Sequence, residues 1–378
     1  MKRAYSVFLT ALCVLTLAVA LCCAAGCSSQ STPTAKSTVS EDTKYGAAIV
    51  MLTQDEFEQS GIQLGDSCDI EFGNGYTLTD VPYFNGYYTK TGEPLIVAYP
   101  GSEHVTITLN NTGLWDNAAL TEGDSVRITL NEAGKYGTIQ EALGQVYSSN
   151  KADYASTVEF CNYRALAGGN LKENFFFRGA SPVDNSRGRA ADVDDLIEAQ
   201  GVAFILDLAD TEENMSEHLA ADGFDSPYAK ALFENNQAAL LGMSSAFASQ
   251  EYKQHVADGF RAMLQSDGPV YIHCTEGKDR TGFVCTLLEA LANASYDEML
   301  ADYMKTYENY YGVTKAETPE KFDAISSLYF DAFMEELLGT SDTSTYKDAD
   351  YTQAAADYLQ QGGMTAEEIE QLKAFIAK

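Results

Sequence analysis

The sequence predicts an α/β protein, in which a domain with a mostly parallel sheet flanked by helices is preceded by a small β-rich domain. From about residue 46 to 131, short β-branched runs are separated by Gly, Asn and Pro turns, which is typical of β structure. After about residue 157, strand-like and helix-like stretches alternate, as they do where helices cover a parallel sheet. With 378 residues, 45% of them hydrophobic, the chain can bury a core in each domain.

The first 26 residues have the composition of an export signal. Lys2 and Arg3 precede an apolar run, and the small residues Ala-Ala-Gly then lead to Cys27. We therefore expect residues 1–26 to be a signal peptide. The sequence AAGC resembles the lipobox of bacterial lipoproteins, which implies lipid on Cys27 and a location outside the cytoplasm, anchored to the cell membrane. A retained membrane helix is the alternative.

Residues 27–45 are mostly small and polar, which is the composition of a flexible tether. Residues 46–135 are expected to form the β-rich accessory domain, as a small sandwich or barrel. This region has no catalytic constellation, so an accessory or binding role is expected. Its predicted strands are 47–52, 68–72, 94–99, 104–109 and 125–130.

The second domain is predicted for residues 155–378. The runs VAFILDLA (202–209) and VYIHC (270–274) are expected to be buried strands. Toward the C-terminus the pattern is helical. Capping boxes, in which a hydroxyl and a carboxylate satisfy N–H groups at a helix start, predict helices that begin at Ser295 and Thr365.

The charge balance is strongly acidic. Lys and Arg total 24 against 55 Asp and Glu, which gives a formal net charge of -31. Such a surface repels nucleic acid at long range, so no nucleic-acid partner is predicted. An acidic surface that only keeps the protein soluble is the plainer interpretation.

Beyond the export segment, the cysteines are widely spaced and show neither a disulfide pattern nor zinc-ligand spacing. The four histidines do not cluster with them. We expect no metal and no cofactor. The cysteines are Cys68, Cys161, Cys274 and Cys285.

The run VYIHCTEGKDRTGF predicts a loop between an apolar strand and an apolar helix. Five residues, including Gly277, separate Cys274 from Arg280. Such a loop can turn successive N–H groups inward, and the helix adds its positive N-terminal end, so that a tetrahedral anion fits. Both effects also favour the thiolate, which is the reactive form of cysteine. Arg280 offers a planar fork that can bind two phosphoryl oxygens.

Two other interpretations of this loop are weaker. A nucleotide-binding P-loop needs G-x-x-x-x-G-K-[ST], and the first Gly is absent. A free core cysteine beside a surface arginine would not explain the strand-loop-helix context.

The segment HCTEGKDRTG (273–282) closely resembles the HCxxGKDRTG loop of the atypical bacterial tyrosine and dual-specificity phosphatases. The likeness covers roughly residues 155–340 and does not extend to the β-rich region. Ala165 and Ala209 stand where Asp and Arg are common in that family, so no role is transferred to them. Further similar segments are NYRALAGG (162–169), FFFRGASPVDN (175–185) and VAFILDLAD (202–210).

The resemblance implies a role for each loop residue. Cys274 would attack phosphorus and form a cysteinyl-phosphate, Arg280 would bind the phosphate, and Thr281 would hydrogen-bond the departing sulfur. His273 would orient the loop. Lys278 would contact an anionic substrate at the rim, or is a solvated lysine. The other residues expected to bind substrate are Thr275, Glu276, Gly277 and Gly282.

The leaving oxygen of the substrate needs a proton, usually from an Asp. The stretch AALLGMSSAFAS (238–249) before the cysteine strand contains no acid. Asp279 is therefore the expected general acid, in agreement with the resemblance, and Asp207 and Asp210 are reserves. An Asp279 that only bonds the loop backbone is the alternative.

Three functions are compatible with the sequence. The first is a protein-tyrosine or dual-specificity phosphatase, whose partner is a phosphorylated protein or peptide. The second is a phosphoinositide or inositol-phosphate phosphatase, since Lys278 suits polyphosphorylated rings, although Glu276 and the net charge argue against highly charged substrates. The third is a lipoprotein binding module with an inactive phosphatase loop.

Cys27→Ser should release the protein from the membrane into the medium or periplasm, because the variant has no thiol to accept lipid. Fractionation of cells and mass spectrometry of the mature N-terminus would check this. An unmodified mature chain that begins at another residue would contradict the lipoprotein hypothesis.

Overall fold

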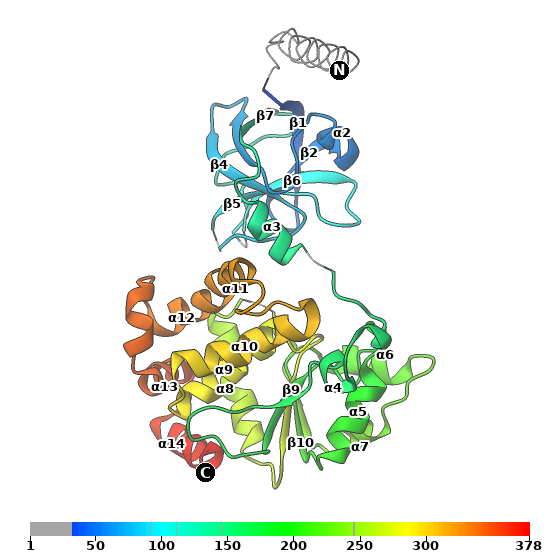
Figure 1. Cartoon of the computed structure of the whole chain (residues 1–378), viewed down its shortest axis with the longest axis vertical. Coiled ribbons are helices and arrows are strands. Elements are labelled where there is room, and N and C mark those ends of the chain that lie inside the picture. Colours follow the sequence, from blue (N-terminus) through cyan, green and yellow to red (C-terminus); the bar gives the residue numbers. More distant parts are fainter. Residues whose placement is uncertain (1–31, 91, 111, 145, 245) are drawn as a thin grey trace, which may run out of the picture. The chain divides into compact units, whose positions relative to one another are not determined.

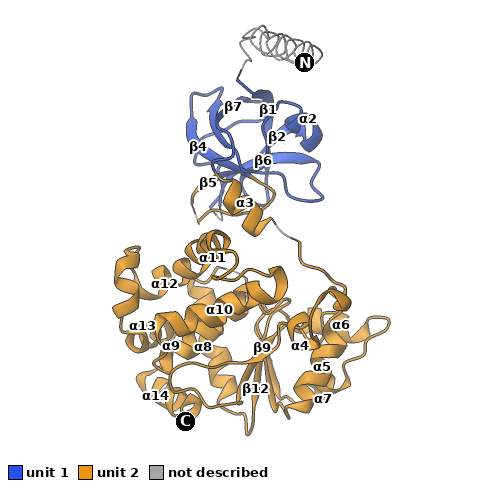
Figure 2. Ribbon diagram, viewed as in Figure 1, with its two compact units in different colours: residues 1–83, 94–135 blue, residues 84–93, 136–378 orange. Residues whose placement is uncertain are grey.

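The computed structural model describes residues 32–378 except 91, 111, 145 and 245. The chain divides into two compact units, residues 1–83 with 94–135 and residues 84–93 with 136–378 (Figure 2). The predicted signal peptide and Cys27 lie outside the described residues. Among the helices of the described part, none has an apolar stretch long enough to span a bilayer.

The first unit is a closed barrel with the strand order β1-β2-β6-β5-β4-β3-β7 (Figure 1). Antiparallel pairing of β1 with β7 closes it, so that its strands leave no free edge. Apolar side chains such as Ile70, Ile107 and Ile128 fill the interior. The elements are β1 (Thr34–Asp42), β2 (Ala47–Thr53), α2 (Gln54–Glu58), β3 (Ser67–Phe72), β4 (Thr77–Phe84), β5 (Pro94–Val97), β6 (His104–Leu109) and β7 (Ser125–Glu132).

The tether prediction is wrong over residues 34–42, which form strand β1 of this barrel. Only two apolar side chains of the strand, Ala35 and Val39, are buried, and the other residues are small or charged. Backbone pairing with both β2 and β7, rather than an apolar run, holds the strand in place. The composition of the segment therefore resembles that of a tether.

The second unit contains a five-stranded sheet with the order β11-β10-β12-β9-β8. Four strands, β11, β10, β12 and β9, run parallel, and β8 is antiparallel to β9. The predicted mixed α/β class is thereby confirmed. The strands are β8 (Arg164–Ala165), β9 (Phe176–Gly179), β10 (Phe204–Asp207), β11 (Ala238–Leu240) and β12 (Val270–His273).

Side chains alternate between the two faces of this sheet, as the period of a strand requires. Val270 and Ile272 pack with α8 (Gln250–Met263), α9 (Asp279–Leu291) and α13 (Tyr351–Gln361). Tyr271 packs on the opposite face with α4 (Thr157–Phe160), α5 (Ala190–Ala199) and α7 (Pro227–Glu234). These three helices lie to the right of the sheet in Figure 1. The other helical elements are α3 (Gly137–Leu143), η1 (Lys151–Asp153), α6 (Glu212–Ala220), α10 (Tyr296–Tyr311), α11 (Pro319–Ile325), η2 (Ser326–Phe330), α12 (Asp331–Leu338), η3 (Thr343–Asp348) and α14 (Ala366–Ile376).

The register of the parallel strands brings their C-terminal ends together. Asp207 of β10 lies opposite His273 of β12, and His273 lies opposite Gly179 of β9. The segments that follow these three residues therefore begin at one edge of the sheet, where ligands bind in open α/β sheets. The predicted loop is one of these segments.

Candidate active site

The loop that starts at Cys274 connects β12 to the 13-residue helix α9. Cys274 is buried, with 3% of its surface exposed. Among the described residues, no acceptor receives a hydrogen bond from the backbone N–H groups of residues 275–280. A run of unpaired donors at the positive end of a helix suits an anion.

Gly277 shapes the loop, because no other residue fits its position. Its φ is +68°, and a Cβ there would lie 2.2 Å from the carbonyl oxygen of Gly179. The Gly277 carbonyl accepts hydrogen bonds from Asn162 Nδ2 at 3.1 Å and from Arg178 Nη2 at 2.9 Å. The loop is thus packed against the end of β9 and bonded to groups behind it.

Those groups belong to a buried ionic network that the sequence analysis did not find. Asp302 of α10 accepts from Arg164 Nε at 2.7 Å and also from Arg178. Burial alone would raise the pKa of Asp302, but the two guanidinium groups outweigh it and hold the pKa below its usual value. The available signal was the Asn-Tyr-Arg run at 162–164, to which no role had been assigned.

Among the described residues, Arg280 has one hydrogen-bond partner beyond the loop. Its Nη1 donates to the carbonyl oxygen of Met243 at 2.9 Å, and Nη2 is 3.4 Å from Thr275 Oγ1. The hydroxyl of Thr281 is buried and has no hydrogen-bond partner among the described residues. The predicted contacts of Arg280 with phosphate and of Thr281 with sulfur stay predictions.

Lys278 and Asp279 form an ion pair at the start of α9. Lys278 Nζ lies 2.9 Å from each carboxylate oxygen of Asp279. It also lies 5.7 and 5.6 Å from the ring centroids of Tyr307 and Tyr329, within cation–π range. Burial opposes the charge of Lys278, yet the carboxylate outweighs it, and the pKa is raised well above its usual value. Lys278 is therefore a charged, largely enclosed side chain, and the Asp279 carboxyl is 48% exposed.

Three titratable side chains gather where β10 and β12 end. Burial lowers the pKa of His273 to about 4, so its ring is neutral near pH 7. Its Nε2 lies 3.8 Å from Asp207 Oδ2, and Asp207 Oδ1 accepts from the N–H of Asp210 at 3.1 Å. Burial, followed by the charge of Asp207, raises the pKa of Asp210 to about 6. Asp210 therefore titrates in a range useful for proton transfer.

Glu276 is bonded to side chains outside its own loop. Its Oε1 accepts from the hydroxyl of Tyr147 and lies 3.4 Å from Arg187 Nη2. Its carbonyl oxygen accepts from the hydroxyl of Tyr310 at 2.8 Å. Tyr147 lies between α3 and η1, in a part of the sequence where no site residue was expected.

Gly282 has a packing role inside α9. It is buried, and a Cβ there would lie 2.8 Å from the ring of Tyr303. The predicted contacts of Gly282, Thr275 and Glu276 with substrate stay predictions.

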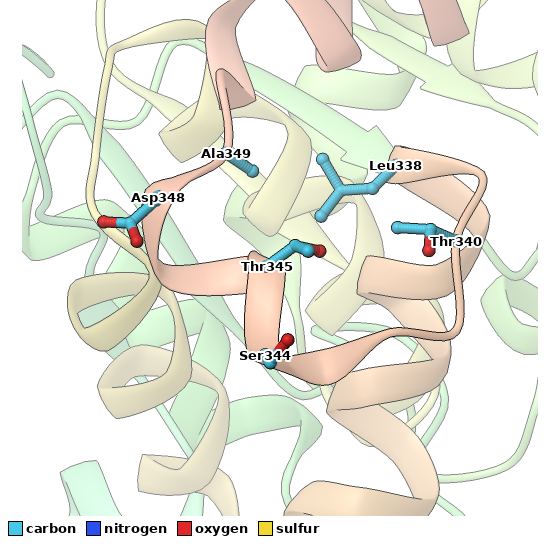
Figure 3. Close-up of a pocket in the computed structure, with 6 residues that line it drawn as sticks. All are labelled: Leu338, Thr340, Ser344, Thr345, Asp348 and Ala349. Carbon is cyan, nitrogen blue, oxygen red and sulfur yellow. The ribbon is translucent and has the colours of Figure 1, made fainter.

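A depression of about 450 Å³ lies between the end of α12 and η3 (Figure 3). Its lining includes none of the predicted site residues. In the described part of the chain, no group of three or more His, Cys, Asp and Glu side chains could hold a metal ion. The depression is lined by Leu338, Thr340, Ser344, Thr345, Asp348 and Ala349.

Comparison with known proteins assigns most of the second unit to a family. Residues 159–377, more than half of the chain, match the pattern described as "Tyrosine phosphatase family". A tyrosine-protein phosphatase of Nostoc commune is 32% identical over 130 residues, which cover 31% of this chain and 44% of that protein. A Cupriavidus necator protein with a tyrosine-protein phosphatase name is 42% identical over 48 residues, 13% of this chain and 18% of that protein.

The chain thus spans less than half the length of either relative. The crystal structure of an uncharacterized conserved protein from Thermotoga maritima matches 26% of this chain and 36% of that chain, at 16% identity. Its TM-score of 0.24 is too low to support an argument about the fold.

Gly277→Ala should lower the free energy of unfolding by about 2 to 4 kcal/mol and distort the loop. The positive φ of this position is unfavourable for alanine, and the added Cβ would clash with the carbonyl oxygen of Gly179. Gly201→Ala is the matched control: its φ is +63°, but a Cβ there meets no atom within 4 Å. The control should cost about 1 kcal/mol. Equal losses in denaturant unfolding would show that the contact with Gly179 is unimportant.

Proposed function

The chain belongs to the tyrosine phosphatase family, and from this premise we propose that it hydrolyses phosphate monoesters of proteins through a cysteinyl-phosphate on Cys274. The observation that carries the proposal is the run of unpaired N–H donors at residues 275–280 beside a buried thiol. These donors suit the three equatorial oxygens of a phosphoryl group, over which negative charge spreads in the transition state.

The reaction would take two steps. The Cys274 thiolate attacks phosphorus, an S–P bond forms, and the P–O bond to the leaving group breaks as that oxygen takes a proton from an acid. Water then attacks phosphorus and gives a proton back to the conjugate base of that acid, the S–P bond breaks, and phosphate leaves as the thiolate returns. Arg280 would bind two phosphoryl oxygens in both steps, with its hydrogen bond to Met243 directing the fork.

Phosphotyrosine is the substrate that the burial of the nucleophile favours. Cys274 is only 3% exposed, and a phosphotyrosine side chain extends further from the peptide than phosphoserine does. A phosphatase of dual specificity would need a thiol that the shorter phosphoserine side chain can also reach. We therefore propose phosphotyrosine as the preferred substrate.

The phosphoinositide alternative depended on Lys278 as a contact for additional phosphates. Its ammonium is bonded to Asp279 and lies over two tyrosine rings, so binding a second phosphate there would require it to leave this pair. The inactive-module alternative has no observation in its favour, since Cys274 and Arg280 are both present. Attachment to the outer face of the cell membrane by lipid on Cys27 remains part of the proposal.

Cys274→Ser should abolish turnover and keep phosphate binding, because serine is a far weaker nucleophile while the backbone donors remain. Hydrolysis of phosphotyrosine peptide, phosphoserine peptide and inositol phosphates would be measured for both proteins, with and without EDTA. Activity of more than about a few per cent in the serine variant, or loss of wild-type activity in EDTA, would contradict the proposed chemistry.

Of the three carboxyl groups considered as the general acid, those of Asp279 and Asp210 can be separated by paired variants. If Asp279 donates the proton, Asp279→Asn should be slow on an alkyl phosphate and much less impaired on an activated aryl phosphate, which leaves without a proton. If Asp279 serves only to hold Lys278 and the loop, both substrates should suffer alike. The measurement is kcat/KM against leaving-group pKa.

Asp210→Asn is the companion test. An acid must be protonated to donate, so an enzyme that uses Asp210 should lose activity as pH rises through its pKa of about 6. Asp210→Asn should then remove this basic limb and show the dependence on leaving group. An unchanged pH profile would exclude Asp210 and leave Asp279 or Asp207.

A further inference from the structure

The loop carries its own competitor for a bound anion. Glu276 is the second residue after Cys274, and its carboxylate belongs to the same loop as the unpaired N–H groups of residues 275–280. Carboxylates form strong hydrogen bonds with backbone N–H groups. A carboxylate without another partner would therefore seek the donors that a phosphoryl group needs.

In the structure, the Glu276 carboxylate is bonded to side chains outside its own loop. The Tyr147 hydroxyl donates to Glu276 Oε1. Burial, with the nearby carboxylate as the next cause, raises the pKa of Tyr147, so the phenol stays protonated and remains a donor. Arg187 is the other partner, but at 3.4 Å and with 45% of its side chain exposed it is a weak, solvent-screened ion pair. The Tyr147 hydroxyl is thus the better of the two partners.

Tyr147 is held firmly enough to act as an anchor. Its ring stacks on Tyr310 with centroids 4.7 Å apart and planes 15° apart, and the Arg189 guanidinium lies 4.9 Å from its centroid. Tyr147 is 9% exposed, whereas the preceding Val146 is 91% exposed. One side chain of this connecting segment is buried while its neighbour faces solvent.

We propose that Tyr147 is a positioning residue that holds the Glu276 carboxylate away from the backbone donors of the phosphate loop. The inference rests on the proposed function, because it assigns those donors to a phosphoryl group. Tyr147 precedes residues 159–377, which match the family, so the residue that holds Glu276 lies outside the matched region. Without the hydroxyl, Glu276 would occupy the donors part of the time and act as an internal competitive inhibitor.

An internal competitor has a defined kinetic signature. It reduces the fraction of molecules that can bind, so the apparent dissociation constant and KM rise by the same factor. At saturating substrate the competitor is displaced, so kcat changes much less. A general disturbance of the loop would lower kcat instead.

The test uses Tyr147→Phe, which removes the hydroxyl and keeps the ring that stacks on Tyr310. The dissociation constant of inorganic phosphate would be measured by calorimetry, and KM and kcat with an aryl phosphate, in the full chain. Phosphate affinity should fall on the order of 10- to 100-fold, as expected for loss of a hydrogen bond to a charged group, with an equal rise in KM. Removing the charge in Tyr147→Phe/Glu276→Gln should restore phosphate binding to the value of Glu276→Gln alone.

Tyr154→Phe is the matched control. Its hydroxyl donates to the carbonyl oxygen of Ser148 and accepts from Arg189 Nη2 at 3.2 Å, and it makes no hydrogen bond with residues 274–280. This variant should bind phosphate like the wild type. Thermal unfolding of all variants shows whether any has failed to fold.

The outcomes separate this inference from the proposed function. Normal phosphate affinity in Tyr147→Phe, or a loss that persists with Glu276→Gln, overturns the role of Tyr147 while Cys274-dependent turnover stands. Absence of turnover, together with a Tyr147-dependent affinity for phosphate, would overturn the proposed function and retain the inference. A wild-type chain that binds no phosphate overturns both.

Discussion

The carbonyl oxygen of Gly277 is the point at which the loop is attached to the buried part of its unit. It accepts hydrogen bonds from Asn162 and from Arg178, and Arg178 is fully buried. A guanidinium that is removed from water needs a counter-charge, and Asp302 supplies it. The position of the loop thus depends on a charge balance behind it, not on contacts of the loop residues alone.

This arrangement explains why the donors of the loop remain available. The carbonyl of Gly277 points to Asn162 and Arg178, and that of Glu276 accepts from Tyr310. These carbonyl groups are bonded to side-chain donors, and the N–H groups of residues 275–280 have no acceptor among the residues that the structure describes. Breaking the buried network would leave a charge unpaired, and such losses cost about 3 to 5 kcal/mol.

The strand-loop-helix arrangement around Cys274 and the mixed α/β class were predictable because their determinants are local. The strand, the loop and the apolar helix around Cys274 are contiguous in sequence, and β12 and α9 follow the predicted pattern. Strand β1 was not predictable in this way, since its stability comes from neighbours on both sides rather than from its own side chains. The local sequence pattern predicts an element that has an apolar run of its own. It does not predict a strand whose stability comes from pairing with neighbouring strands.

The remaining parts of the site join residues that are distant in the chain. Asn162 is 115 positions from Gly277, and Tyr147 is 129 positions from Glu276. No periodicity links such pairs, so only the folded chain shows that the Glu276 carboxylate, which in sequence argued against highly charged substrates, is bonded to a phenol. That contact reduces the objection, because the Glu276 carboxylate is bonded to Tyr147 and Arg187 rather than to the N–H groups of its own loop. The acid inside the loop is compatible with anion binding as long as a residue from outside the matched region holds it.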